Sequence, residues 1–122
     1  MNLHLRYRLW IAEMNFDINV LRIFHEYLGE LGAKKGIAEV QKGIEQFEAR
    51  FAALRKEIDD LKNEMHLVKM TLAAYAREKK AMDEKTYQSE NHIPIKKRYT
   101  AFREEFEKAK EEFGEFESKW LE

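Results

Sequence analysis

The sequence predicts an all-α protein, an elongated antiparallel three-helix bundle with coiled-coil packing, with residues 1–122 forming a single helical domain. Three observations support this fold class. Apolar residues recur every three or four positions over most of the chain, as in helices that pack on other helices. Charged residues make up 37% of the sequence, which suits long solvated helices. The single proline, Pro94, leaves long segments free of helix breakers.

The first predicted helix spans about residues 2–28. Its opening alternates apolar and polar residues with period two, which also fits a β-hairpin. Its polar side chains, however, fall on one stripe at about 100° per residue, which favours a helix. These are His4, Arg8, Asn15, Asn19, Arg22, Glu26 and Glu30. The glycines that follow, Gly29, Gly32 and Gly36, predict the first turn, because glycine past a helix end accepts a left-handed backbone.

The second predicted helix spans about residues 36–83 and carries a heptad seam, meaning two rows of apolar residues on one face. The rows are Ile37, Ile44, Phe51, Ile58, Met65 and Leu72, and Val40, Phe47, Leu54, Leu61, Val68, Tyr75 and Met82. At 1.5 Å per residue this helix is about 70 Å long and its neighbours about 40 Å each. We therefore expect three overlapping helices only near the middle, with a two-helix strip at each end.

The third predicted helix spans about residues 94–121, after a turn at residues 86–93. Ser89 or Asn91 provides the N-cap, and Pro94 lies in the first turn, where its missing N–H does no harm. Its own seam is mainly aromatic and consists of Ile95, Tyr99, Phe102, Phe106, Ala109, Phe113, Phe116 and Trp120. Short turns make both outer helices antiparallel to the middle one.

The first helix has more apolar side chains than one packed face needs, and the middle helix has a similar excess near its end. Contiguous exposed apolar patches typically mark interfaces. The predicted interaction face comprises Leu9, Phe16, Val20, Ile23, Tyr27, Leu67 and Met70. We therefore expect a non-enzymatic interaction or scaffolding protein that forms a homodimer, binds a helical protein partner, or both. A compact monomer with a folded-back middle helix is the alternative architecture.

Three charged residues of the first helix lie opposite its polar stripe and predict a buried polar cluster: Arg6, Glu13 and Asp17. Two carboxylates four residues apart repel each other unless a cation lies between them. An interhelical ion pair that fixes the register explains the cluster best. A carboxylate metal site is the weaker alternative, because the four histidines lack the Glu-x-x-His spacing of di-metal bundles.

A basic run, Lys96, Lys97 and Arg98, is the candidate phosphate contact. It opens the predicted third helix, where the helix dipole also favours anions. The alternative function is therefore a nucleic-acid-associated bundle. Glutamates dominate the rest of that helix, and the net charge of −1 gives no overall attraction to nucleic acid or to an anionic membrane. Nucleic acid is thus the less favoured partner.

Other classes of protein find no support in the sequence. There is no cysteine, hence no disulfide and no thiolate nucleophile. No apolar run approaches the roughly 20 residues of a membrane span, and residues 1–10 lack the apolar core of a signal peptide. We expect a cytoplasmic protein without cofactor or small-molecule site. The closing Leu121 and Glu122 fit a cloning remnant, in which case the chain is part of a longer protein.

The stretch from Leu54 to Lys80 locally resembles the long first helix of the all-helical chorismate mutases. Arg55 matches one substrate-binding arginine of that family. The family's second arginine and its catalytic lysine fall on Leu72 and Asp83, which cannot neutralise a dicarboxylate. The resemblance therefore implies no enzyme activity for this chain.

Overall fold

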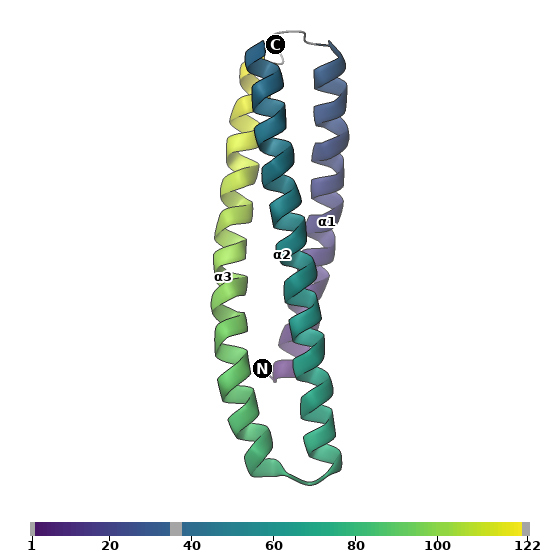
Figure 1. Cartoon of the computed structure of the whole chain (residues 1–122), viewed down its shortest axis with the longest axis vertical. Helices are drawn as coiled ribbons and strands as arrows, with labels where there is room; N and C mark the ends of the chain where they lie inside the picture. The colour runs from purple at the N-terminus through teal and green to yellow at the C-terminus, as the bar shows by residue number, and fades with distance from the viewer. Residues whose placement is uncertain (1, 35–37, 121–122) are drawn as a thin grey trace.

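The computed structural model describes residues 2–34 and 38–120, which form three long helices running up, down and up in one bundle (Figure 1). Helix α1 spans Leu3–Lys34, α2 spans Ala38–Arg77, and α3 spans Ala81–Trp120. Helix α2 packs against both neighbours, and the described residues contain no strand. The predicted all-α, elongated three-helix bundle is confirmed.

The predicted seams of α2 and α3, apart from Met82, which is 83% exposed, form one core with a face of α1. On α2 the buried residues are Val40, Ile44, Phe51, Leu54, Ile58, Leu61, Met65 and Val68. Those of α3 are Ile95, Tyr99, Phe102, Phe106, Ala109 and Phe113, and those of α1 include Tyr7, Met14, Leu21, Leu28 and Leu31. Burial of each large apolar side chain contributes about 1.5–3 kcal/mol, so the core holds the three helices together.

Helix α1 begins where predicted but ends later. The Asn2 side chain caps its start, because its Oδ1 accepts a hydrogen bond from the Leu5 backbone N–H at 2.9 Å. The helix then continues through Gly29 and Gly32 to Lys34, and no described glycine has a positive φ. The predicted glycine turn is therefore wrong at these two positions; residues 35–37 lie outside the described part. Burial of Leu31 on the core favours the added turn.

The second turn lies at residues 78–80, earlier than predicted, so α2 ends at Arg77 and Met82 belongs to α3. The Lys80 backbone N–H donates to the Tyr75 carbonyl at 3.0 Å, and that of Lys79 to the Ala76 carbonyl at 3.2 Å. Lys79 has a φ of 58°. This is a Schellman cap built without the glycine that usually marks it in a sequence.

Replacing Lys79 by glycine is expected to stabilise the protein by about 1 kcal/mol, since a left-handed backbone is unfavourable for a residue with a Cβ. Urea unfolding followed by circular dichroism measures the change. Lys80→Gly is the control, because the lysine next door has no positive φ. Destabilisation by Lys79→Gly would contradict the described turn.

Helix α3 begins at Ala81, so the predicted turn at residues 86–93 is wrong and Pro94 lies well inside the helix. Pro94 has no N–H to donate to the Glu90 carbonyl, and its exposed ring faces solvent. Packing of α3 on α2 outweighs this cost: the rings of Tyr75 and Tyr87 meet edge to face at 5.6 Å. Asn91 also donates its side-chain amide to the Tyr87 carbonyl at 2.8 Å.

The three helices run side by side for most of the bundle's length, but the last turns of α2 and the first turns of α3 extend past the start of α1 (Figure 1). The predicted two-helix strip is therefore wrong at the end of the bundle where α3 ends, while a short strip of α2 and α3 remains next to the α2–α3 turn (Figure 1). The reason is length, since α1 has 32 residues and α3 has 40, more than their predicted ranges. One copy of the chain thus buries a continuous core.

Candidate functional site

One side of α1 remains apolar and exposed in the bundle. The exposed fractions are 45% for Leu5, 51% for Leu9, 64% for Phe16 and 52% for Ile23. Exposed Ala12 and the half-buried Val20 and Tyr27 fill the intervals on the same side of the helix. We call this row of seven residues the α1 stripe: Leu5, Leu9, Ala12, Phe16, Val20, Ile23 and Tyr27.

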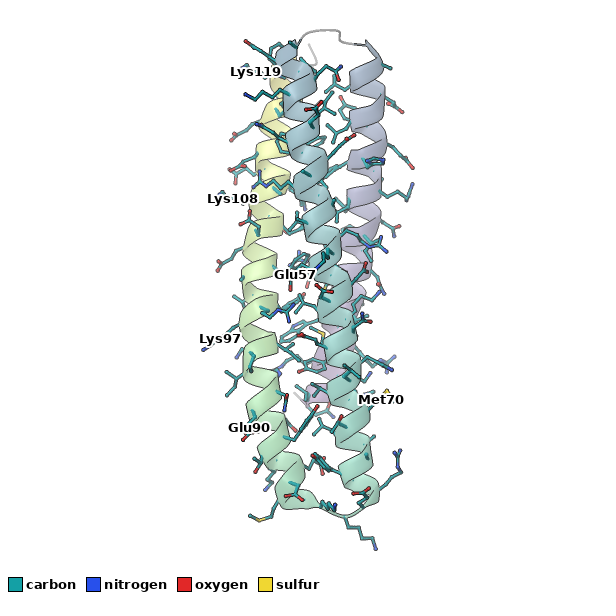
Figure 2. All side chains as sticks on the ribbon, viewed as in Figure 1. Glu57, Met70, Glu90, Lys97, Lys108 and Lys119 are labelled. Carbon is teal, nitrogen blue, oxygen red and sulfur yellow. The ribbon has the colours of Figure 1, made fainter. Side chains whose placement is uncertain are left out.

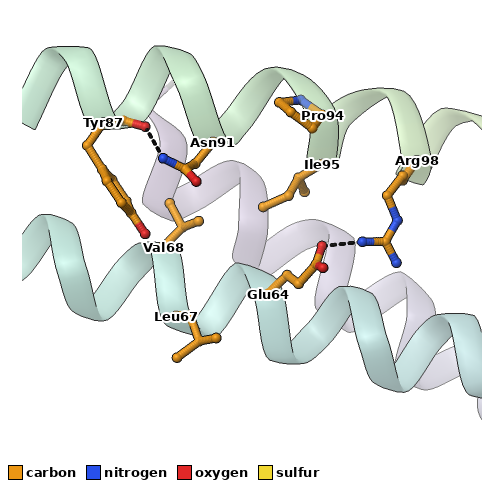
Figure 3. Close-up of a pocket in the computed structure, with 8 residues that line it drawn as sticks. All are labelled: Glu64, Leu67, Val68, Tyr87, Asn91, Pro94, Ile95 and Arg98. Carbon is orange, nitrogen blue, oxygen red and sulfur yellow. Dashed lines mark hydrogen bonds and ion pairs between the residues drawn. The ribbon is translucent and has the colours of Figure 1, made fainter.

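The structure divides the predicted interaction face between two surfaces. Leu9, Phe16 and Ile23 lie exposed on the α1 stripe, while Val20 and Tyr27 pack partly against the core. The two α2 residues, Leu67 and Met70, are 59% and 56% exposed, but Leu67 lines a shallow groove between α2 and α3. Figure 3 shows this groove, whose other lining residues are Glu64, Val68, Tyr87, Asn91, Pro94, Ile95 and Arg98.

Beside the α1 stripe, two of the three residues of the predicted polar cluster meet a cation from α3. Asp17 is only 2% exposed and accepts a hydrogen bond from Arg103. The same guanidinium lies 3.2 Å from Glu13, which also accepts a hydrogen bond from the Tyr99 hydroxyl at 2.6 Å. The cation that the two carboxylates need is therefore Arg103, and the cluster joins α1 to α3.

Ionisation in this cluster follows from its burial. Burial raises the pKa of the Asp17 carboxyl, although the hydrogen bond from Arg103 opposes the shift. Burial, and then the Glu13 carboxylate, raise the pKa of the Tyr99 hydroxyl, so Tyr99 stays protonated and donates. Among the described residues, no three His, Asp or Glu side chains are placed to hold a metal ion. These contacts are those of an ion pair that fixes the register of α1 and α3.

Arg6 does not belong to this cluster, contrary to the sequence prediction, and instead contacts His92 of α3. Its Nη1 lies 3.2 Å from His92 Nε2, and Tyr7 Oη lies 3.1 Å from Nδ1. A guanidinium only donates, so Nε2 is the acceptor and the neutral ring carries its proton on Nδ1, which donates to Tyr7. Trp10 stacks on the His92 ring with centroids 6.1 Å apart.

Acidification through the ordinary pKa of histidine is expected to destabilise the bundle. Burial, and then Arg6 and Lys96, lower the pKa of His92 below its usual 6.5. The unfolded chain therefore takes up this proton first as the pH falls below 6.5, and stability is lost. Protonation would also point an N–H of the ring at Arg6. Urea unfolding at pH 7.5 and 5.5 measures the loss.

The control for this pH effect is His92→Gln, which keeps a polar side chain but does not titrate. We expect a smaller loss of stability between the same two pH values, because the exposed His4, His25 and His66 are common to both proteins. An identical pH dependence of the two proteins would contradict the role given to His92.

The three residues of the predicted phosphate contact do not form one basic surface. Arg98 donates to both Glu57 and Glu64 of α2, whereas Lys96 and Lys97 are exposed and Lys97 points away from the bundle (Figure 2). The run also lies well inside α3, because the helix begins at Ala81. The N-terminus of α3, whose dipole favours anions, therefore lies at Ala81 and not beside this basic run.

Arg98 has a counterpart in Arg50, and both line another groove between α2 and α3. Arg50 of α2 pairs with Glu105 and Glu112 of α3, just as Arg98 of α3 pairs with Glu57 and Glu64 of α2. In each case one arginine joins two carboxylates that lie a heptad apart on the facing helix. Such half-exposed pairs contribute little energy each, but together they match the register of α2 and α3.

The sequence prediction missed Arg103 and His92, although a signal for both was present. Arg6, Glu13 and Asp17 are spaced by seven and four residues, and His92, Tyr99 and Arg103 repeat that spacing. In the structure each residue of the first set meets its counterpart, 86 positions later. Parallel helices with matched spacing bring such sets together, but only once α1 and α3 are known to be neighbours.

No protein-family model, curated protein or solved structure matches this chain. Among the described residues, none of the helices combines the length and apolarity needed to cross a bilayer. The candidate site therefore rests on the geometry of the bundle itself.

Proposed function

We propose that this protein is a non-enzymatic interaction or scaffolding module whose working surface is the α1 stripe, through which it self-associates or binds a helical protein. The exposure of the stripe is the observation that supports this function. Leu5, Leu9, Phe16 and Ile23 each leave about half of their surface in water, at a free-energy cost of about 25 cal/mol per Å². A partner helix that covers them recovers this energy.

The surroundings of the stripe also suit an interface. Along one edge, polar residues form a rim like those found around apolar interface centres: Arg8, Asn15, Asn19, Arg22 and Glu26. Along the other edge, the contacts of Glu13 and Asp17 with Arg103 hold α1 on α3. Because α1 is already fixed on the bundle, it loses little freedom when a partner binds.

Replacing Ile23 by glutamate is expected to weaken association with any partner of the stripe by roughly 30-fold or more, as for a buried interface residue. Ile93→Glu is the matched control, because Ile93 is 53% exposed against 52% for Ile23 but lies on α3. Self-association is measured by light scattering during size-exclusion chromatography. Binding of other proteins is measured by affinity capture from cells.

Both variants should keep the helicity of the wild type, since both side chains are exposed in the single copy. The proposed function would be wrong if every association of the wild type, with itself or with another protein, survived Ile23→Glu as well as Ile93→Glu.

A further inference from the structure

The spacing of the α1 stripe is the same in both directions along the helix. Its positions are 5, 9, 12, 16, 20, 23 and 27, which are separated by 4, 3, 4, 4, 3 and 4 residues. Phe16, which is 64% exposed, lies at the centre. A row with this symmetry matches itself when a second helix lies against it in the opposite direction.

We propose that the partner of the α1 stripe is the α1 helix of a second copy, antiparallel to the first and related to it by a twofold axis at Phe16. This inference rests on the proposed function and specifies its partner. The axis places Leu9 opposite the partner's Ile23, Ala12 opposite the partner's Val20, and the two Phe16 rings against each other. Every apolar position of one stripe meets an apolar position of the other, as an isologous interface requires.

The charges on the edge of the stripe that carries Arg8 and Glu26 favour the antiparallel direction, whereas Glu13 and Asp17 on the other edge are paired with Arg103. Arg8 and Glu26 lie on the same edge of α1, beside the face that carries Phe16. With the axis at Phe16, Arg8 lies only two residues, about 3 Å along the helix, from the level of the partner's Glu26. The symmetry forms this pair twice. Opposed helix dipoles add to the preference.

A parallel pair of α1 helices has the opposite electrostatics. In that pair, residues of equal number lie level with each other, and the edge that carries Arg8 in one copy faces the edge that carries Arg6 in the other. Arg8 therefore approaches the partner's Arg6. Like charges in contact destabilise an interface. In the single copy Glu26 pairs with Arg22, but both side chains are more than half exposed, at 58% and 59%. Glu26 can therefore leave Arg22 and pair with Arg8 of a second copy at little cost in free energy.

Cysteine cross-linking tests the direction and register of this pair, because the chain has no cysteine of its own. Two proteins are prepared, Ala12→Cys and Val20→Cys, and are oxidised separately and as a mixture. In the proposed pair, position 12 of one copy faces position 20 of the other. The mixture should therefore form the mixed disulfide at least about tenfold faster than either protein forms a disulfide with itself.

Thr100→Cys, exposed on α3, mixed with Ala12→Cys measures the rate of disulfides formed by random collision. Circular dichroism verifies that each variant keeps its helicity. Rapid self-linking of Ala12→Cys alone would indicate a parallel pair and overturn this inference, while leaving the proposed function intact.

A wild type that stays monomeric, with no cross-linking above the collision rate, would also overturn the inference. In that case the proposed function would still stand if Ile23→Glu, and not Ile93→Glu, abolished the binding of another protein. If that binding were also unaffected, both proposals would be wrong.

Discussion

Replacement of Leu61 by aspartate is expected to unfold the protein. Leu61 is fully buried on α2, in the core that α1, α2 and α3 share. Removal of a buried leucine side chain costs about 2–5 kcal/mol, and a buried carboxylate without a partner adds several kcal/mol. The sum approaches the whole stability of a typical domain, about 5–15 kcal/mol. Far-UV circular dichroism measures the lost helicity.

Leu67→Asp is the control for this prediction, because it makes the same chemical change on the same helix. Leu67 is 59% exposed, so its aspartate stays hydrated and the bundle should keep its helicity. Equal helicity of the two variants and the wild type would show that the α2 seam is not the core of the protein.

Replacement of Arg103 by alanine is expected to lower the free energy of unfolding by about 3–5 kcal/mol, the usual cost of breaking a buried ion pair from one side. The variant leaves Asp17, which is 2% exposed, without its cation, and also removes the cation beside Glu13. Urea unfolding at neutral pH measures the loss. The control is Arg22→Ala, whose exposed pair with Glu26 is worth less than about 1 kcal/mol.

The pH dependence of the Arg103→Ala variant provides a further test. Burial raises the pKa of Asp17 above its ordinary 3.8, so the folded protein binds this proton more tightly than the unfolded chain. A raised carboxyl pKa means that stability rises as the pH falls through the folded-state value. Loss of Arg103 removes the hydrogen bond that opposes this shift. The difference in unfolding free energy between the wild type and the variant should therefore become smaller at acid pH.

Asp17→Asn isolates the same effect without a change of pH. Because asparagine has no charge to leave unpaired, Arg103→Ala should cost much less in the Asp17→Asn background than in the wild type. If the cost is equal in both backgrounds, the Asp17–Arg103 contact is not the source of the loss.

The heptad pattern predicted the core well because burial depends on which face of a helix a residue occupies. Leu61 on α2 and Phe106 on α3 were assigned to seams, and both are buried in the structure. The side-chain period of a helix is fixed by its geometry, so the apolar rows on a long helix predict its packed face without knowledge of the neighbours.

Helix ends were predicted less well, because local signals compete there with packing. Gly32 looked like a turn residue, yet α1 continues past it as Leu31 becomes buried and Gln41 of α2 donates to the Gly32 carbonyl at 3.2 Å. The true second turn has Lys79 in a left-handed conformation, which a sequence without glycine there does not indicate. At Gly32, tertiary contacts outweighed the local preference.

The order of the residues along the chain established the class of fold, the faces of the helices that pack, and the apolar excess on α1. It also showed that Glu13 and Asp17 need a cation. The packing of the three helices was needed to show that Arg103 supplies this cation, that Arg6 instead contacts His92, and that Leu67 lies apart from the α1 stripe. Periodicity fixes the side of a helix on which each residue lies, whereas contacts between helices depend on their register, and the packed core sets that register.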